Sequence, residues 1–166
     1  MLLGTFSVLV LVVEDYERFR RFLISTLRNR WEKLDIREVS DGLEAVREAQ
    51  SLQPDLILLD IGLPTLNGIE AARRVRKLSP ISKIVFVTQE SSPDVIEEAL
   101  GLGALGYVVK THAGRDLIAA VEAVREGRQF VSAGVASQRP TEIADKQAPK
   151  GLHPHGVLAP IPEARD

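Results

Sequence analysis

The sequence predicts a doubly wound α/β domain, in which a parallel sheet of five strands is covered by five helices. Two observations support this prediction. Short aliphatic runs alternate with longer stretches whose apolar residues recur every three or four positions, as in strands followed by amphipathic helices. The first, third and fourth runs are apolar almost throughout, which is typical of strands covered by helices on both faces.

The first two strands and their helices have the clearest signals. Val8–Val13 predicts a strand because β-branched residues dominate it, and Tyr16–Arg30 follows with aromatic residues and leucines at helical spacing. Leu34–Val39 alternates apolar and charged residues, which suits a strand at the edge of the sheet. Asp41 is expected to cap the next helix, Leu43–Leu52, which ends before a proline.

The third and fourth strands are predicted at Asp55–Leu59 and Lys83–Val87, where aliphatic residues dominate. Between them, Ile69, Ala72 and Val75 recur at every third position, which indicates the third helix. These segments continue the alternation of strand and helix.

Proline and glycine mark the last two helices. Pro93 stands where the first residue of the fourth helix is expected, and Gly101 and Gly103 are expected to end that helix. The fifth strand is predicted at Leu105–Val109, and the fifth helix is expected to stop at Gly127.

The chain is expected to contain one folded domain, residues 1–131, followed by a proline-rich tail, residues 132–166. Five of the nine prolines lie in this tail, which has no apolar periodicity, so we expect it to be mostly disordered. His153 and His155 flank one of these prolines and give only a weak metal signal. They and His112 are expected to be ordinary surface residues.

Composition narrows the possible functions. The 166 residues include 21 Lys and Arg against 23 Asp and Glu, and this balance argues against direct DNA binding. The chain has no cysteine, which excludes a disulfide scaffold and thiolate metal ligands. The first aliphatic run has no basic residue before it and ends at Glu14, so we expect neither a signal peptide nor a membrane anchor, and a cytoplasmic protein.

Polar side chains are expected where four of the strands end. Glu14 and Asp15 follow the first strand, Asp60 the third, Thr88 the fourth and Lys110 the fifth. The carboxyl ends of parallel strands meet at one edge of the sheet, where ligands bind. Three neighbouring carboxylates repel one another unless a cation joins them, and their hard oxygens suit Mg²⁺. A carboxylate beside a cation and a lysine can attack a phosphoryl group.

These residues and their neighbours resemble the receiver domain of bacterial two-component response regulators. The resemblance covers roughly residues 7–131, and its matching segments are Val8–Asp15, Leu58–Pro64, Ile84–Thr88 and Gly103–Lys110. Thr111 and the segment before it are most similar to receivers attached to a LuxR-type DNA-binding domain. The resemblance implies a flavodoxin-like sheet of five strands in the order 2-1-3-4-5.

The resemblance also implies a role for the charged residues at this edge. Asp60 would accept a phosphoryl group from the phosphohistidine of a sensor histidine kinase or a phosphotransfer protein. Asp15, Asp60 and the backbone carbonyl of Gly62 would bind Mg²⁺ directly, and Glu14 would act through water. Lys110 would pair with Asp60 and then with the phosphoryl group.

Four further residues would respond to the phosphoryl group or modulate access to it. By the resemblance, Thr88 would turn toward the group, and Tyr107 would swing inward into the space released. Gln89, where many receivers have a small residue, could narrow access to Asp60. Glu90 lies near the incoming phosphoryl group in the family and could orient water or disfavour anionic donors.

The expected function is therefore that of a phosphoacceptor switch protein without external turnover. We expect a downstream protein partner, and the resemblance implies a homodimer through the face of the fourth and fifth helices. No effector domain is expected, because nothing after Phe130 indicates one, although the chain could be a truncated relative of a DNA-binding regulator. Two alternatives remain open: a receiver-fold interaction module that phosphorylation does not regulate, and a phosphatase with an aspartate nucleophile. The phosphatase is disfavoured because Gly62 stands where its second aspartate would be.

Overall fold

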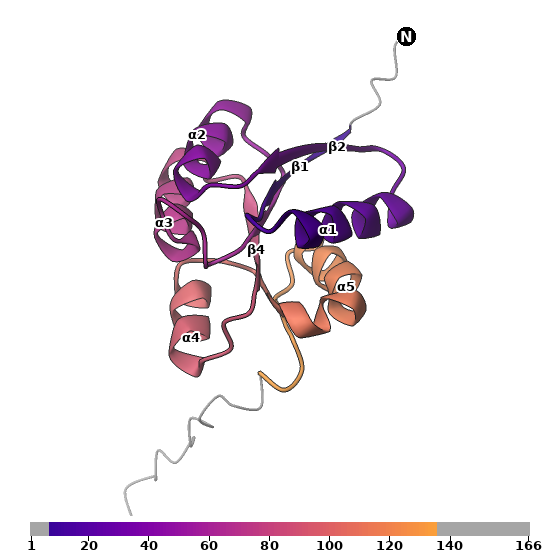
Figure 1. Ribbon diagram of the computed structural model, residues 1–166, viewed down its shortest axis with the longest axis vertical. Coiled ribbons are helices and arrows are strands. Elements are labelled where there is room, and N and C mark those ends of the chain that lie inside the picture. The colour runs from indigo at the N-terminus through magenta and orange to yellow at the C-terminus, as the bar shows by residue number, and fades with distance from the viewer. Residues whose placement is uncertain (1–6, 136–166) are drawn as a thin grey trace, which may run out of the picture.

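In the computed structural model, residues 7–135 form a parallel sheet between two layers of helices (Figure 1). Residues 1–6 and 136–166, including His153 and His155, lie outside the part of the chain that the structure describes. The described strands are β1 (Val8–Val13), β2 (Leu34–Val39), β3 (Leu56–Leu59), β4 (Lys83–Thr88), β5 (Gly106–Val109) and β6 (Phe130–Val131). The described helices are α1 (Glu17–Arg30), α2 (Gly42–Leu52), α3 (Gly68–Leu78), α4 (Pro93–Gly101), the 3₁₀ turn η1 (Lys110–His112) and α5 (Ala113–Arg125).

Two apolar clusters hold the layers together, one on each face of the sheet. Helices α2, α3 and α4 pack on one face, and α1 and α5 pack on the other (Figure 1). Each central strand supplies both clusters, since successive side chains point to opposite faces. In β4, for example, Phe86 belongs to the cluster under α2, α3 and α4, and Val85 belongs to the cluster under α1 and α5. This double coverage explains why these strands are apolar at almost every position.

Most of the predicted elements are confirmed. Strands β1 and β2 have the predicted bounds, and β2 lies at the edge of the sheet as its alternating pattern indicates. Asp41 caps α2 by accepting hydrogen bonds from the amides of Leu43 and Glu44. Pro93 lies in the first turn of α4, and Gly127, with φ of 77°, follows α5.

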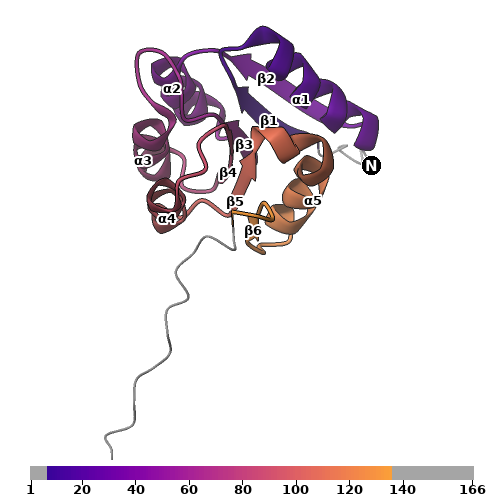
Figure 2. The same cartoon turned by 60° about the horizontal axis from the view of Figure 1, so that its bottom comes forward.

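The predicted number of strands is wrong by one. Within residues 7–135 the sheet has six strands in the order β2-β1-β3-β4-β5-β6, because β6 pairs in parallel with β5 (Figure 2). Strand β6 has only two residues, too few to produce a hydrophobic period. The packed structure also continues past residue 131, since Ser132 and Val135 are both buried.

Trp31 lies at the edge of the sheet where the strands begin. It follows the last residue of α1, and its ring has the guanidinium groups of Arg30 and Arg125 at 5.4 Å and 5.8 Å from its centroid. Lys83, the first residue of β4, donates a hydrogen bond to the carbonyl of Arg125. These contacts join the C-terminal ends of α1 and α5.

Among residues 7–135, no helix is both long enough and apolar enough to cross a membrane.

Candidate functional site

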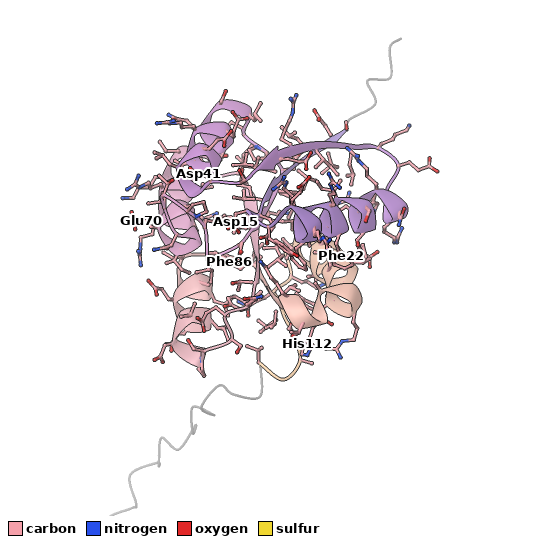
Figure 3. All side chains as sticks on the ribbon, viewed as in Figure 1. Asp15, Phe22, Asp41, Glu70, Phe86 and His112 are labelled. Carbon is pink, nitrogen blue, oxygen red and sulfur yellow. The ribbon has the colours of Figure 1, made fainter. Side chains whose placement is uncertain are left out.

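A cleft of about 600 Å³ opens at the edge of the sheet where the strands end. Eight of the nine predicted site residues line it, namely Glu14, Asp15, Asp60, Gly62, Thr88, Gln89, Glu90 and Lys110. The labelled Asp15 lies between α1 and the α2–α3 layer in Figure 3. Tyr107 does not line the cleft and is completely buried. The parallel topology therefore brings together residues that are up to 96 positions apart in the sequence (110 − 14).

Backbone hydrogen bonds extend the sheet by one residue and so position the two buried carboxylates. The amide of Glu14 donates to the carbonyl of Val39 (3.0 Å), and the amide of Asp60 donates to the carbonyl of Val13 (3.1 Å). The side chain of Arg20 donates to the carbonyl of Glu14 (2.9 Å) from the first half of α1. Hydrogen bonds therefore fix the backbone of the two residues, Glu14 and Asp60, that carry these carboxylates.

Lys110 joins the two buried carboxylates. Its Nζ lies 2.7 Å from Glu14 Oε2 and donates to Asp60 Oδ2 at 2.9 Å. It also lies 4.8 Å from the ring centroid of Phe19, an arrangement that adds cation–π attraction. Burial acts to lower the pKa of Lys110, but the carboxylates of Glu14 and Asp60 outweigh it and raise the pKa above its usual value. Lys110 is therefore a persistent positive charge in the cleft.

Glu14 is the most buried of the acidic residues, with 1% of its surface exposed. Its Oε1 accepts a hydrogen bond from the amide of Tyr16 (3.0 Å). Burial raises the pKa of Glu14, against the opposing effect of Lys110, and the nearby charge of Asp60 raises it further. Burial and the neighbouring carboxylate of Asp60 therefore both disfavour the charged form of Glu14.

The two carboxylate oxygens of Asp60 have different partners. Oδ1 accepts from the amide of Ile61 (2.7 Å), while Oδ2 accepts from Lys110. Directly beside the backbone of Asp60 lies Gly68, where an added Cβ would be 1.9 Å from the Asp60 carbonyl oxygen. The first residue of α3 thus packs directly on the backbone of Asp60, a contact that only glycine allows.

The acidic residues fit a divalent cation. Glu14, Asp15 and Asp60 each offer a carboxylate oxygen, and these oxygens lie within 4.8 Å of one another. Glu14 Oε2 is buried and has no hydrogen-bond donor of suitable geometry, its cationic neighbour being Lys110. Clustered hard oxygens on a partly open site match the preference of Mg²⁺, which retains several waters.

The other wall of the cleft is the loop between β4 and α4. Thr88 is buried, and its Oγ1 accepts from the amide of Glu90 (3.3 Å). The Glu90 Oε1 accepts from the amides of Ser91 and Ser92, at 3.1 Å and 3.0 Å, so this carboxylate binds its own loop. The Tyr107 hydroxyl donates to the carbonyl of Glu90 (2.7 Å), so the tyrosine already points inward.

The burial of the Tyr107 hydroxyl predicts how the free energy of unfolding changes with pH. Burial first, and then the charges of Glu90 and Asp60, raise the pKa of Tyr107 above its ordinary value of 10.0. Its contribution to stability is therefore fully present below pH 10.0 and is lost as pH rises toward the folded-state value. Urea unfolding from about pH 9 to about pH 11 should show a steeper loss of stability for the wild type than for Tyr107→Phe. Equal slopes would contradict the buried, protonated phenol.

Four lining residues were not predicted: Tyr16, Phe19, Ile61 and Thr111. The helical spacing of aromatic residues in Tyr16–Arg30 predicts only a helix position for Phe19, although its ring also lies beside the ammonium of Lys110. A usable signal was present, because the first turn of a helix that follows a strand lies at the same edge of the sheet as the end of that strand. Aromatic residues in the first turn of α1 could therefore have been placed beside the acidic pair.

Comparisons with known proteins agree with this geometry. The family profile described as "Response regulator receiver domain" matches residues 10–122. The transcriptional activator protein ExaE of Pseudomonas putida is 30% identical over 129 residues, which cover 78% of this chain and 60% of that protein. The DNA-binding transcriptional activator DevR/DosR of Mycobacterium tuberculosis is 32% identical over 145 residues, which cover 86% of this chain and 67% of that protein.

Solved structures give the same result. A two-component response regulator of the LuxR family from Aurantimonas has a TM-score of 0.73 at 28% identity, covering 79% of this chain and 94% of that one. The receiver domain of the putative response regulator NarL from Mycobacterium tuberculosis has a TM-score of 0.67 at 26% identity. The match covers 74% of this chain and 98% of that one. The chain spans about three fifths of the length of the first curated relatives that it matches.

Proposed function

The chain belongs to the family of response regulator receiver domains, which act in two-component signalling, and from this premise we propose that it is a phosphoacceptor switch whose acceptor is Asp60. One observation carries the proposal. The carboxylate of Asp60 lines an open cleft beside a lysine and two further carboxylates, in a domain of this family. This arrangement provides a nucleophile, a cation for the phosphoryl oxygens and ligands for Mg²⁺.

The proposed reaction is a phosphoryl transfer to the Asp60 side chain. A carboxylate oxygen of Asp60 forms a bond to phosphorus while the phosphorus–nitrogen bond of a phosphohistidine breaks. The electron pair of that bond leaves with the imidazole nitrogen, which takes up a proton. The donor is a sensor histidine kinase or a phosphotransfer protein.

Each neighbouring residue has a proposed part in this transfer. Lys110 pairs with Asp60 before the reaction, and its ammonium then stabilises the charge on the phosphoryl oxygens. Asp15, Asp60 and the carbonyl of Gly62 would hold Mg²⁺ directly, with Glu14 acting through water, and the ion would supply positive charge to offset that of the phosphoryl group. The hydroxyl of Thr88 donates to a phosphoryl oxygen.

The output of the switch is a change in partner binding rather than turnover of an external substrate. A shift from 1:99 to 99:1 between two conformers needs about 5.5 kcal/mol of differential interaction. One hydrogen bond from Thr88 to a charged group supplies about 1.5–3 kcal/mol. Lys110 and the bound cation therefore have to contribute as well. We expect the switch to change the binding of a downstream protein partner and of a second copy of the chain.

The decisive experiment is the mass of the intact protein after incubation with acetyl phosphate and Mg²⁺. We expect a single phosphoryl adduct, located on the peptide that contains Asp60. Chelation of the metal should remove most of the adduct, because the carboxylate cluster then carries uncompensated charge. A wild-type protein without any adduct, given either acetyl phosphate or a panel of phosphorylated histidine kinases, would refute the proposed acceptor role.

A further inference from the structure

After α5, residues 130–135 return to the sheet and lie beside β5. We call residues 130–135 the C-terminal latch. The amide of Phe130 donates to the carbonyl of Leu105, and the amide of Ser132 donates to the carbonyl of Tyr107, both at 2.9 Å. The latch therefore bonds directly to the backbone of Tyr107, whose hydroxyl contacts the cleft residue Glu90.

Ser132 makes the most specific contact of the latch. It is completely buried, and its Oγ accepts a hydrogen bond from the amide of Val109 at 3.1 Å. Val109 is the last residue of β5 and immediately precedes Lys110. Ser132 also contributes, after Arg115, to the lowered pKa of the buried Asp116 in the first turn of α5. The serine hydroxyl thus holds the end of β5 at the residue that immediately precedes Lys110.

The end of the latch reaches the opposite face of the sheet. Val135 is buried in the same apolar cluster as Tyr107 and the α4 residue Ile96. The hydroxyl of Tyr107 donates to the carbonyl of Glu90, whose amide donates to Thr88. Contacts therefore run without a gap from the latch to the wall of the cleft.

We infer that Ser132 is a positioning residue of the Asp60 site and that occupancy of this site and attachment of the C-terminal latch stabilise each other. By holding the amide of Val109, Ser132 fixes the point at which Lys110 leaves β5. Loss of this contact leaves a buried amide unpaired and frees the backbone that carries the ammonium. The coupling is reciprocal, since a group that strengthens the site also strengthens the latch. The inference rests on the proposed function.

The test uses the full chain, Mg²⁺ and beryllofluoride, a phosphoryl analogue that needs no donor. Ser132→Ala should weaken beryllofluoride binding by about fivefold or more, and Ser132→Thr should restore most of the affinity. Ser82→Ala is the matched control. Ser82 is equally buried, but its hydroxyl donates to the carbonyl of Pro54, at the edge of the sheet where the strands begin. The affinity of Ser82→Ala for beryllofluoride should stay within about twofold of that of the wild type.

Hydrogen exchange supplies a second readout. Beryllofluoride should slow amide exchange in the peptide that covers residues 130–135 of the wild type, and it should have no effect there in Asp60→Asn. The inference would be overturned if a folded Ser132→Ala protein bound beryllofluoride as tightly as the wild type. It would also be overturned if bound beryllofluoride left the amide exchange of residues 130–135 unchanged in the wild type.

A third variant separates this inference from the proposed function. If the wild type forms no phosphoryl adduct and binds no beryllofluoride, the acceptor role fails, and Lys110→Met then decides on the latch. Faster exchange at residues 130–135 in Lys110→Met, relative to the exposed-lysine control Lys33→Met, would support the coupling without any phosphoryl group. Unchanged exchange would refute it.

Discussion

Replacing Asp60 with asparagine abolishes the phosphoryl adduct and leaves the fold at least as stable as that of the wild type. The amide of asparagine is no nucleophile, so the acetyl phosphate experiment should give no adduct. Stability should behave differently, because Asp60 is repelled by two carboxylates and attracted by one ammonium. Its removal relieves a net repulsion of about 1 kcal/mol, the size of one such pair in water-like surroundings. The asparagine oxygen can still accept from Lys110.

Urea unfolding with and without Mg²⁺ provides the measurement. In the absence of metal, Asp60→Asn should be more stable than the wild type by up to about 1 kcal/mol. Saturating Mg²⁺ should stabilise the wild type more than the variant, since it binds the folded cluster and the variant has lost one ligand. A variant that keeps its adduct would place the acceptor elsewhere. A variant that loses several kcal/mol would show that Asp60 serves mainly to hold the fold.

Replacing Gly68 with alanine should damage the site by moving the backbone of Asp60. The new Cβ would lie 1.9 Å from the Asp60 carbonyl oxygen and 2.8 Å from the Cα of Ile61, both backbone atoms. Backbone cannot rotate away as a side chain can, so α3 and the loop after β3 have to separate. We expect a loss of about 3 kcal/mol or more in the free energy of unfolding. Adduct formation should also fall in the fraction that remains folded.

Gly101 provides the matched control for this substitution. It is the last residue of α4, and an added Cβ would meet nothing within 4 Å. Gly101→Ala should therefore be neutral or stabilising by up to about 1 kcal/mol, because alanine favours helix over glycine. Equal unfolding midpoints for Gly68→Ala and the wild type would show that the close approach of α3 to Asp60 does not exist in solution.

The sequence was sufficient to predict the first five strands and the polar residues at the carboxyl ends of four of them. Aliphatic runs mark the strands, and parallel topology brings together whatever follows them, so Glu14, Asp60 and Lys110 could be grouped without knowing any distance. The same argument missed Phe19, because an aromatic residue at helical spacing has an ordinary explanation in the core.

Features that depend on tertiary contact could not be predicted. Strand β6 is too short to show a period, and it is a strand only because the edge of β5 offers free backbone groups. The direction of the Glu90 carboxylate depends on two loop amides, which no local pattern reveals. The buried position of Tyr107 depends on a carbonyl 17 residues away in the sequence. The roles proposed for these residues remain predictions.

The stacked position of Trp31 makes the chain suitable for optical titration. It is the only tryptophan in the sequence, and α1 separates it from the cleft by about 20 Å, the length of its 14 residues. Its fluorescence should therefore report global unfolding, with little direct influence from ligands at Asp60. An emission change on adding beryllofluoride would then be a signal carried through α1 or α5, whose last residues place guanidinium groups 5.4 Å and 5.8 Å from the centroid of the indole ring.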